Sequence, residues 1–381
     1  MQSEEREMLR GSLRRLLTET DPAKLPAALD EFGWPELLAS DPGEAVPALF
    51  ETQGETVTAS PALNAVMAGP LLAVGRLETA GAAGPARVAA TAMAADAASA
   101  GAGVGEWTVV LPGPGSGSAG RPAAVYAVAA GAPVGRCLVV GQHGGQATLA
   151  VVDTAGSDGS RADGAVVGTT GSGGREATGA VVGTAGSGGL DATGPVEFVD
   201  GVDPWLGLVR IVDRGSPAVQ VAARGDAVTA AWAESVAAGR RALAHELLGL
   251  NRAMLALAVD HARERRQFGQ PIGAFQAVKH RLAEAKVALT AAEAAAGEAW
   301  ADPGPLTALL AKLWAGRAAR LTGKQAQQVL GGMGFTWEHP FHRHLRRALV
   351  LDALLGSATG LAQELGRSLL ATGEVPRLAR L

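Results

Sequence analysis

The stretch that decides the fold is RRQFGQPI, which runs from Arg265 to Ile272. It ends a long segment rich in alanine and leucine, and Gly269 and Pro271 are residues typical of a helix end. The sequence FQAVKHRLA then opens the next helical segment at Phe275. Taken alone, this pattern is explained by a helix terminus whose arginines suit the negative end of the helix dipole.

A second stretch, QVLGGMGF from Gln328 to Phe335, lies further along the chain. Its three glycines, Gly331, Gly332 and Gly334, follow the end of another helical segment. A glycine cap followed by a turn explains them. Close approach of the backbone to a ligand also explains them, because glycine lacks a Cβ atom.

Length, charge and cysteine content narrow the class of protein. The 381 residues suffice for two or three domains, and 33 basic residues nearly balance 37 acidic ones, so no nucleic-acid or membrane-surface partner is indicated. The one cysteine, Cys137, excludes an internal disulfide and suits a reducing compartment.

The acidic N-terminal segment contains no apolar run, so no signal peptide is visible. The sequence contains no uninterrupted apolar stretch of about 20 residues, so we predict no membrane span. We therefore expect a cytoplasmic protein.

The first part of the chain, residues 1–84, predicts a short helical domain. Ser3 can cap a helix whose apolar stripe includes Leu9 and Leu13, and Pro26 suits the first turn of another. The helices predicted here are 3–18, Pro26–Glu31, Ala45–Glu55 and Ala62–Leu77.

Residues 85–225 predict a middle β domain. Short runs rich in β-branched residues are bounded by Gly, Pro and Asp, and we expect them to form an antiparallel sandwich or barrel. The predicted strands are Glu106–Leu111, Ala123–Ala129, Arg136–Val140, Ala147–Val152, Glu197–Val199 and Leu206–Val212.

A tandem repeat of period 15 lies inside this domain, within residues 149–193. The sequence GAVVGTTGSGG at Gly164 recurs as GAVVGTAGSGG at Gly179, and a weaker copy starts at Leu149. Three such units could form a small solenoid. Each unit has only two large apolar residues, however, so we expect a duplication that lengthened a surface hairpin or loop.

Residues 226–381 predict an antiparallel four-helix bundle, because long amphipathic segments follow one another with short connections. The fold class is therefore α+β and multidomain, with a helical domain, a middle β domain and a C-terminal bundle. The predicted bundle helices are Ala227–Gln267, Ala274–Ala301, Pro305–Leu330 and His339–Ala371.

In this order and spacing, the two quoted stretches resemble the flavin-contacting signatures of the acyl-CoA dehydrogenase family. The resemblance is strong over about the last 155 residues and extends to the rest in architecture. It implies that Arg265 meets the pyrophosphate of FAD, since a guanidinium donates paired, charge-assisted hydrogen bonds. It also implies that the second stretch reaches the adenine end of an FAD held mainly by a neighbouring subunit. The cofactor-binding residues it implies are Arg265, Phe268, Gln276, Gln328, Gly331 and Gly332.

The same resemblance implies a substrate-side role for Arg240, with an exposed helix arginine beside Arg241 as the alternative. Abstraction of an α-proton from an acyl-CoA needs a carboxylate in an apolar pocket. Leu355 occupies the position where most family members carry that glutamate, and Gly239 occupies the position used by others. Glu246, two helical turns beyond Gly239, is the one weak candidate that remains.

Three other patterns indicate no site. The β domain lacks the family's Thr-Glu-Pro-like segment ending in Gly-Ser-Asp, and Leu111–Gly120 is too degenerate to cradle a flavin ring. The histidines of His339–His344 have irregular spacing and no completing ligands, so no metal is expected. The glycines of Gly113–Gly117 follow no strand-to-helix unit, which argues against a dinucleotide-binding motif.

These observations favour a subunit that completes the FAD site of a homologous catalytic partner, as a heterotetramer or homotetramer. It resembles the non-catalytic partner chain of actinobacterial heteromeric acyl-CoA dehydrogenases. Such a complex would oxidise an acyl-CoA to the trans-2-enoyl-CoA in fatty acid or steroid side-chain β-oxidation. One alternative is a self-sufficient FAD-dependent acyl-thioester dehydrogenase with a displaced base such as Glu246. Another is a non-enzymatic assembly or ligand-binding member of the fold.

Overall fold

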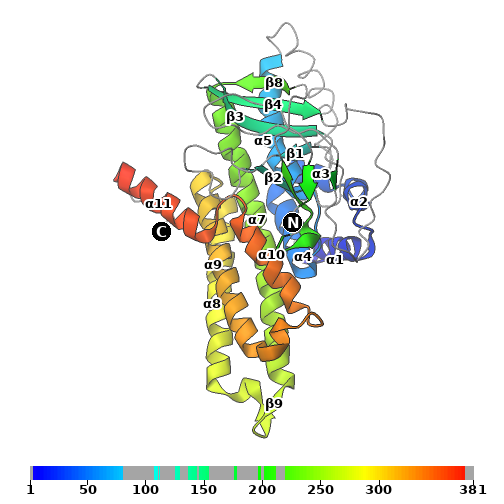
Figure 1. The fold of residues 1–381 in the computed structure, drawn as a ribbon, viewed down its shortest axis with the longest axis vertical. Helices are drawn as coiled ribbons and strands as arrows, with labels where there is room; N and C mark the ends of the chain where they lie inside the picture. The colour runs from blue at the N-terminus through cyan, green and yellow to red at the C-terminus, as the bar shows by residue number, and fades with distance from the viewer. Residues whose placement is uncertain are drawn as a thin grey trace. The chain divides into compact units, whose positions relative to one another are not determined.

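The computed structural model (Figure 1) describes the chain in ten segments, and all statements below concern these residues. They form two compact units, Met1–Ala59 with Val236–Leu381, and Ser60–Ser235. This division groups the first helices with the C-terminal helices, whereas the sequence predicts three consecutive domains, whose boundaries stay a prediction. The described segments are 3–79, 107–109, 111, 125–128, 136–143, 146–153, 176–177, 196–198, 201–211 and 219–373.

The first unit begins with four short helices. Three were predicted from the sequence and are present, with bounds that shift by up to three residues. The helix at Trp34–Ser40 was not predicted, because Gly33 directly before it indicates the end of a helix. In the structure Gly33 has a left-handed backbone and precedes the first residue of this helix. Asp41 caps the fourth helix by accepting a 3.2 Å hydrogen bond from the Glu44 amide. The helices are α1 (Ser3–Glu19), α2 (Leu25–Glu31), α3 (Trp34–Ser40) and α4 (Pro42–Thr56).

Helix α4 packs backbone to backbone against α7 (Asp226–Glu264). A Cβ atom added at Gly54 would lie 2.2 Å from the carbonyl oxygen of Glu246, and one added at Gly249 would lie 2.1 Å from that of Glu51. Two glycines from segments far apart in the sequence therefore allow the axes to come closer than any larger residue permits.

A buried polar network reinforces this contact. Glu51 is 6% exposed and accepts hydrogen bonds from His245 Nδ1 at 2.9 Å and from Arg252 Nη1 at 2.5 Å. Arg10 of α1 reaches the same carboxylate at 2.8 Å, and Trp300 donates to the other ring nitrogen of His245 at 2.9 Å. Burial alone would raise the pKa of Glu51, but the hydrogen bond from His245 and the charges of Arg252 and Arg10 lower it to about 2. The network thus joins three helices through one carboxylate.

The C-terminal helices differ from the prediction at two places. Helix α7 ends at Glu264, before the predicted Gln267, because Arg266–Gln267 (β9) and Gln270–Pro271 (β10) form a hairpin. The single helix predicted at His339–Ala371 is wrong, because it is broken after Ala353. Two predicted helices are confirmed, one of them at its predicted bounds. These helices are α8 (Gln276–Ala301), α9 (Pro305–Leu330), α10 (Phe341–Ala353) and α11 (Ala358–Thr372).

The break between α10 and α11 has a local cause. Leu355 and Gly356 both have positive φ, 54° and 105°, so the chain cannot continue a right-handed helix there. Ser357 then caps α11 by accepting a hydrogen bond from the Gly360 amide. A glycine followed by a serine is a stop and start signal, which the long apolar pattern of this segment obscured.

The second unit contains α5 (Ala62–Thr79) and two four-stranded sheets. One sheet has the order β1-β3-β4-β8 and the other β2-β7-β6-β5. The pairing is antiparallel except between β1 and β3, which are parallel, so the predicted purely antiparallel arrangement is wrong at that pair. The strands are β1 (Trp107–Val109), β2 (Val125–Val128), β3 (Arg136–His143), β4 (Gln146–Asp153), β5 (Glu176–Ala177), β6 (Val196–Phe198), β7 (Leu208–Ile211) and β8 (Val219–Arg224).

Side-chain hydrogen bonds tie α5 to its neighbours. The Asn64 side chain accepts from the Val109 amide at 3.2 Å, and the Ser235 hydroxyl donates to the Met67 carbonyl at 2.7 Å. Strand β8 was not predicted. The run predicted at Leu206–Val212 begins instead with a short 3-10 helix, Pro204–Leu206.

Several expectations fall on residues outside the described segments. These include most of the period-15 repeat and of Leu111–Gly120, and all of Gly113–Gly117. Cys137 is described, is buried and forms no disulfide. Within the described segments, α7 alone is long and apolar enough to cross a membrane, and 67% of its most apolar window is buried in the protein. The expected absence of a membrane span stays a prediction.

We expect Gly249→Ala to lower the stability of the protein by roughly 3 kcal/mol, since the new methyl group would overlap the Glu51 carbonyl. Gly297→Ala in α8 is the matched control, because a Cβ atom there meets nothing within 4 Å. It should raise stability by about 0.5–1 kcal/mol. Thermal and urea unfolding of both variants check this, and equal effects in the two would contradict the close contact.

Candidate functional site

The hairpin between α7 and α8 presents an aromatic side chain to the surface. Its two-residue turn is Phe268-Gly269, with φ of 49° and 79°, the backbone of a type I′ turn. Gly269 suits this conformation, whereas Phe268 adopts it at a steric cost. Phe268 is 92% exposed and makes an edge-to-face contact with Phe275, the ring centroids lying 6.1 Å apart. The Arg266 guanidinium closes the turn with a 3.0 Å hydrogen bond to the Gly269 carbonyl.

The glycine loop forms the 3-10 segment Gly331–Phe335 after α9. Gly331 has φ of 60° and ψ of −134°, a backbone conformation that is strained for residues with a side chain. A Cβ atom added at Gly331 or Gly332 would meet nothing within 4 Å, so the space above both residues is open. The backbone requires glycine at 331, and the open space also permits close approach of a ligand.

The two stretches come together at one end of the first unit (Figure 1). Gln325 of α9 accepts from Arg281 at 2.8 Å and donates to Glu284 at 2.5 Å, which fixes the register of α8 against α9. This pairing places the start of α8, at Gln276, beside the end of α9, at Gln328. We call this surface the hairpin end. It comprises the exposed residues Arg265, Phe268, Gln276, Gln328, Gly331 and Gly332.

Two histidines lie near Arg265 at the hairpin end. The pKa of His261 is lowered first by burial and then by His339 and Arg265, while the Glu264 carboxylate opposes this shift. Within the described segments, no carboxylate forms an ion pair with Arg265. A guanidinium without an acidic partner is suited to a phosphate group.

The histidines beside this end have structural partners. His344 contacts the carbonyl oxygens of Pro340 and Glu55 at 3.1 and 3.2 Å, and His342 packs edge-on to Trp337 at 4.6 Å. The Arg346 guanidinium lies 4.4 Å from the centre of the same indole. Among the described residues, no group of three or more His, Cys, Asp or Glu side chains could hold a metal ion.

The turn around Leu355 forms a second candidate region, which we call the Leu355 turn, residues 352–358. The Arg240 Nε atom donates to the Leu355 carbonyl at 3.1 Å. Lys312 donates to the carbonyls of Asp352 and Gly356 at 3.1 and 3.3 Å. Each of these carbonyls thus has a charged donor, and the turn is held from two other helices.

Three carboxylates lie near this turn, each with a cationic partner. Glu246 is buried and pairs with the fully buried Arg347 at 3.2 Å. Asp352 is buried and pairs with Arg320 at 2.6 Å. Glu364 of α11, whose side chain is 46% exposed, pairs with Arg240 at 3.1 Å. Glu364 alone among them is both accessible and attached to the arginine that holds Leu355.

Sequence reasoning missed Glu364 and Lys312. A continuous helix over 339–371 would have placed Glu364 two and a half turns beyond Leu355. The break at Leu355-Gly356 instead brings it to Arg240. In the sequence, Lys312 is not distinguishable from an exposed helix lysine. Its burial depends on the carbonyl groups of Asp352 and Gly356, which are available because the helix is broken there.

Gly239 and Leu355 occupy the positions where the resemblance places a glutamate. Leu355 is buried, with 8% of its surface exposed, and neither side chain can accept a proton. Arg240 lies beside Leu355, and its guanidinium is bonded to the turn and to Glu364. Its contact with an acyl-CoA stays a prediction.

The stability of the protein should depend on Lys312 in alkaline solution. Burial lowers the pKa of Lys312 to about 8 from 10.5, so the folded protein releases this proton at a lower pH than the unfolded chain does. Unfolding therefore takes up a proton between pH 8 and 10.5, and stability rises with pH through this window. The full gain is on the order of 3 kcal/mol.

Lys312→Met should remove this rise, so the difference between wild type and variant should change with pH only above about 8. Lys286→Met, at a lysine with 59% exposure, is the matched control and should leave the profile unchanged. Unfolding followed from about pH 7 to 10.5 measures both. Parallel profiles for wild type and Lys312→Met would contradict the assignment.

Residues 229–370 match the family described as "Acyl-CoA dehydrogenase, C-terminal domain". The Mycobacterium tuberculosis protein "Acyl-CoA dehydrogenase IpdE2" is 42% identical over 106 residues, which are 28% of this chain and 33% of that protein. "Acyl-CoA dehydrogenase FadE34" of the same organism is 38% identical over 170 residues, 43% of this chain and 23% of that protein. The aligned segments thus span a third or less of these relatives.

Solved structures resemble the chain over nearly its full length. A variant of the "Tcur3481-Tcur3483 steroid ACAD" has a TM-score of 0.68 at 22% identity, covering 97% of this chain and 98% of that one. The "ChsE4-ChsE5 complex from Mycobacterium tuberculosis" has a TM-score of 0.65 at 21% identity, covering 99% of both chains. At such identities the likeness establishes the fold.

Proposed function

Since residues 229–370 belong to the acyl-CoA dehydrogenase family as its C-terminal domain, and the whole chain has that family's fold, we propose that this protein is the non-catalytic subunit of an acyl-CoA dehydrogenase complex. It completes the FAD site of a homologous catalytic partner through its hairpin end. The complex oxidises an acyl-CoA to the trans-2-enoyl-CoA.

The Leu355 turn carries this proposal. Arg240, Lys312 and Asp352 hold the turn in a defined shape, yet the side chain it presents is an apolar leucine in a left-handed conformation. The hydrogen bonds that hold the backbone at position 355 are therefore present, but the residue at this position carries no carboxylate. Leu355 adopts its φ of 54° at a cost on the order of 1 kcal/mol, which the hydrogen bonds to this turn offset.

The residues at the hairpin end fit FAD. Arg265 has no acidic partner among the described residues and can receive the diphosphate. The open space above Gly331 and Gly332 admits an adenine ring, and Gln328 and Gln276 are exposed amides at the same end. The residues of the hairpin end are all exposed on this chain, as residues that complete a neighbour's site must be.

FAD held with the help of Arg265, Gln276 and Gln328 would supply the acceptor for the hydride that leaves the β-carbon of the acyl-CoA. The partner's carboxylate removes the α-proton, since Leu355 and Gly239 cannot. This chain contributes charge, since Arg265 neutralises phosphate, and the buried side chain of Leu355 offers no proton acceptor. The two similar structures are named as pairs of proteins, and one is named as a steroid enzyme, which favours a paired subunit and a steroid side-chain CoA thioester.

We expect the chain purified alone to contain little FAD and to show no dehydrogenase activity. Co-expression with a homologue that carries the glutamate should give a yellow, active complex. Arg265→Gln should then weaken FAD retention about tenfold or more, because a charged phosphate contact is lost. Flavin absorbance and acyl-CoA-dependent dye reduction measure both properties.

Arg263→Gln is the matched control, because Arg263 is 75% exposed and pairs only at 3.6 Å with Asp260 on its own helix. Full flavin loading and turnover by the isolated chain would overturn the proposal. Absence of FAD with every homologous partner would instead favour a non-enzymatic member of the fold.

A self-sufficient dehydrogenase with a displaced base is the second candidate, and the accessible carboxylate of Glu364 favours it. Glu364→Gln should then slow anaerobic flavin reduction by acyl-CoA by roughly a hundredfold or more. Glu246→Gln is the comparison, since Glu246 is bound to buried Arg347 and its loss should lower thermal stability. Unchanged flavin reduction in Glu364→Gln would exclude Glu364 as the base.

A further inference from the structure

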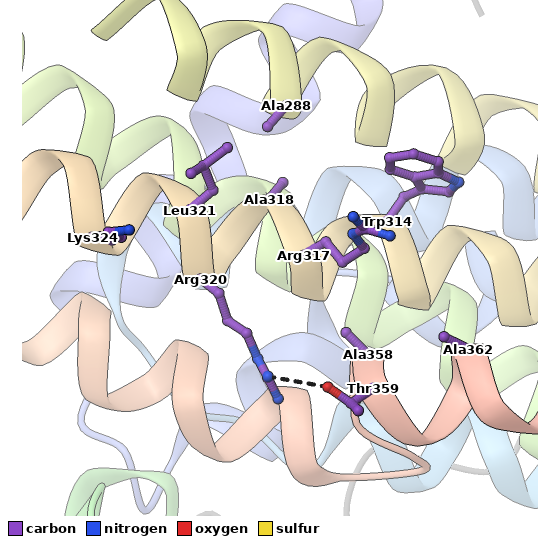
Figure 2. A pocket seen from close by; sticks show the side chains of 10 residues that line it. All are labelled: Ala288, Trp314, Arg317, Ala318, Arg320, Leu321, Lys324, Ala358, Thr359 and Ala362. Atoms are coloured by element: carbon purple, nitrogen blue, oxygen red, sulfur yellow. Dashed lines mark hydrogen bonds between the residues drawn. The ribbon is translucent and has the colours of Figure 1, made fainter. Parts of the chain in front are cut away.

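A groove runs along α9 between α8 and α11 (Figure 2). Its volume is about 590 Å³, within the range of small-molecule sites. Small apolar side chains from all three helices form much of its lining, so a ligand can approach the helix backbones closely. The lining residues used here are Ala288 of α8, Ala318 and Leu321 of α9, and Ala358 and Ala362 of α11.

One stripe of α9 supplies the polar and aromatic groups of this groove. Trp314, Arg317, Leu321 and Lys324 follow one another at helical spacing and so share one face. Arg317 and Lys324 are seven residues apart, about 10 Å along the axis, with Leu321 between them. Both side chains are long enough to reach a single anion above that leucine.

The cations of the groove are not equally available. Arg320 is neutralised by Asp352 at 2.6 Å and also donates to the Thr359 hydroxyl at 3.4 Å, the bond drawn in Figure 2. Arg317 contacts the Trp314 ring, 5.3 Å from its centre, and within the described residues no carboxylate pairs with Arg317 or Lys324. Two positive charges therefore face the groove without compensation.

Trp314 adds a flat surface. Its side chain remains 39% exposed although the residue lies beside an apolar floor. Aromatic rings and guanidinium groups are planar and stack on an indole. The groove thus combines a stacking surface, an apolar floor and two free cations.

We propose that this groove binds an aromatic phosphate monoester, a flat ring that carries one dianionic phosphate. The ring lies over the apolar floor against Trp314, and the phosphate lies between Arg317 and Lys324. A phosphate monoester carries a charge of about −1.5 to −2 at pH 7, which matches the two uncompensated cations. Trp314, at one end of the groove, lies about 21 Å along α9 from Gln328 of the hairpin end, whereas Lys324, at the other end, lies about one helical turn from Gln328. The groove site does not rest on the proposed dehydrogenase function.

Isothermal titration of the full chain with 1-naphthyl phosphate, AMP and inorganic phosphate tests this site. We expect at least one of the two ring phosphates to bind about tenfold or more tightly than inorganic phosphate. Binding of AMP alone identifies a nucleotide as the source of the ligand, and binding of 1-naphthyl phosphate identifies aromatic phosphates more generally. Failure of both ring phosphates to bind, or binding no tighter than that of inorganic phosphate, would overturn the proposal.

Variants locate the binding. Arg317→Gln combined with Lys324→Gln should weaken ring-phosphate binding about tenfold or more, and Trp314→Ala should reduce it to the level of inorganic phosphate. Arg15→Gln combined with Lys24→Gln removes the same charges from exposed positions of the N-terminal helices and should change nothing.

Arg265→Gln separates this groove from the hairpin end, which could also attract a phosphate. It should leave ring-phosphate binding unchanged. Loss of binding in Arg265→Gln with full binding in the groove variants would overturn the proposal. Circular dichroism and thermal unfolding verify that each variant is folded.

Discussion

The close contact between α4 and α7 is the constraint on which the first unit depends. Gly54 and Gly249 let two backbones approach so closely that a methyl group at either position would overlap a carbonyl. Buried Glu51 then joins α1, α4 and α7 through Arg10, His245 and Arg252. Because a buried carboxylate is costly unless it is fully paired, these partners must hold their places together. The rotation of α7 is thereby fixed, and with it the directions of Arg240 and Glu246.

The rotation of α7 governs the Leu355 turn. Arg240 leaves α7 and holds both the Leu355 carbonyl and Glu364, while Glu246 binds buried Arg347 of α10. Lys312 supports the same turn from α9. Four helices therefore converge on one short break, and the side chain presented there is apolar. The proposal that a partner subunit abstracts the proton rests on this geometry.

Much of the helical framework followed from sequence patterns alone. Helix α9 has its predicted bounds, and α1, α4 and α8 differ from prediction by a few residues at their ends, because caps and apolar periodicity are local signals. The break after Ala353 was missed because apolar periodicity continues across Leu354-Leu355 and obscures the stop and start signal of Gly356-Ser357. Strand β8 and the parallel pairing of β1 with β3 were missed because pairing partners are distant in the sequence.

The sequence by itself determined that two stretches resemble flavin-contacting signatures, and that Leu355 and Gly239 stand where this resemblance places a glutamate. Both conclusions depend on residue identity at fixed spacing, which needs no coordinates. Only the tertiary structure decided which charges are available. Glu246 is held by Arg347, Glu364 is brought to Arg240, and Arg317 and Lys324 have no carboxylate partner in the described part of the chain. The pair of Arg240 with Glu364 joins residues 124 positions apart, where spacing in the sequence no longer constrains distance in space.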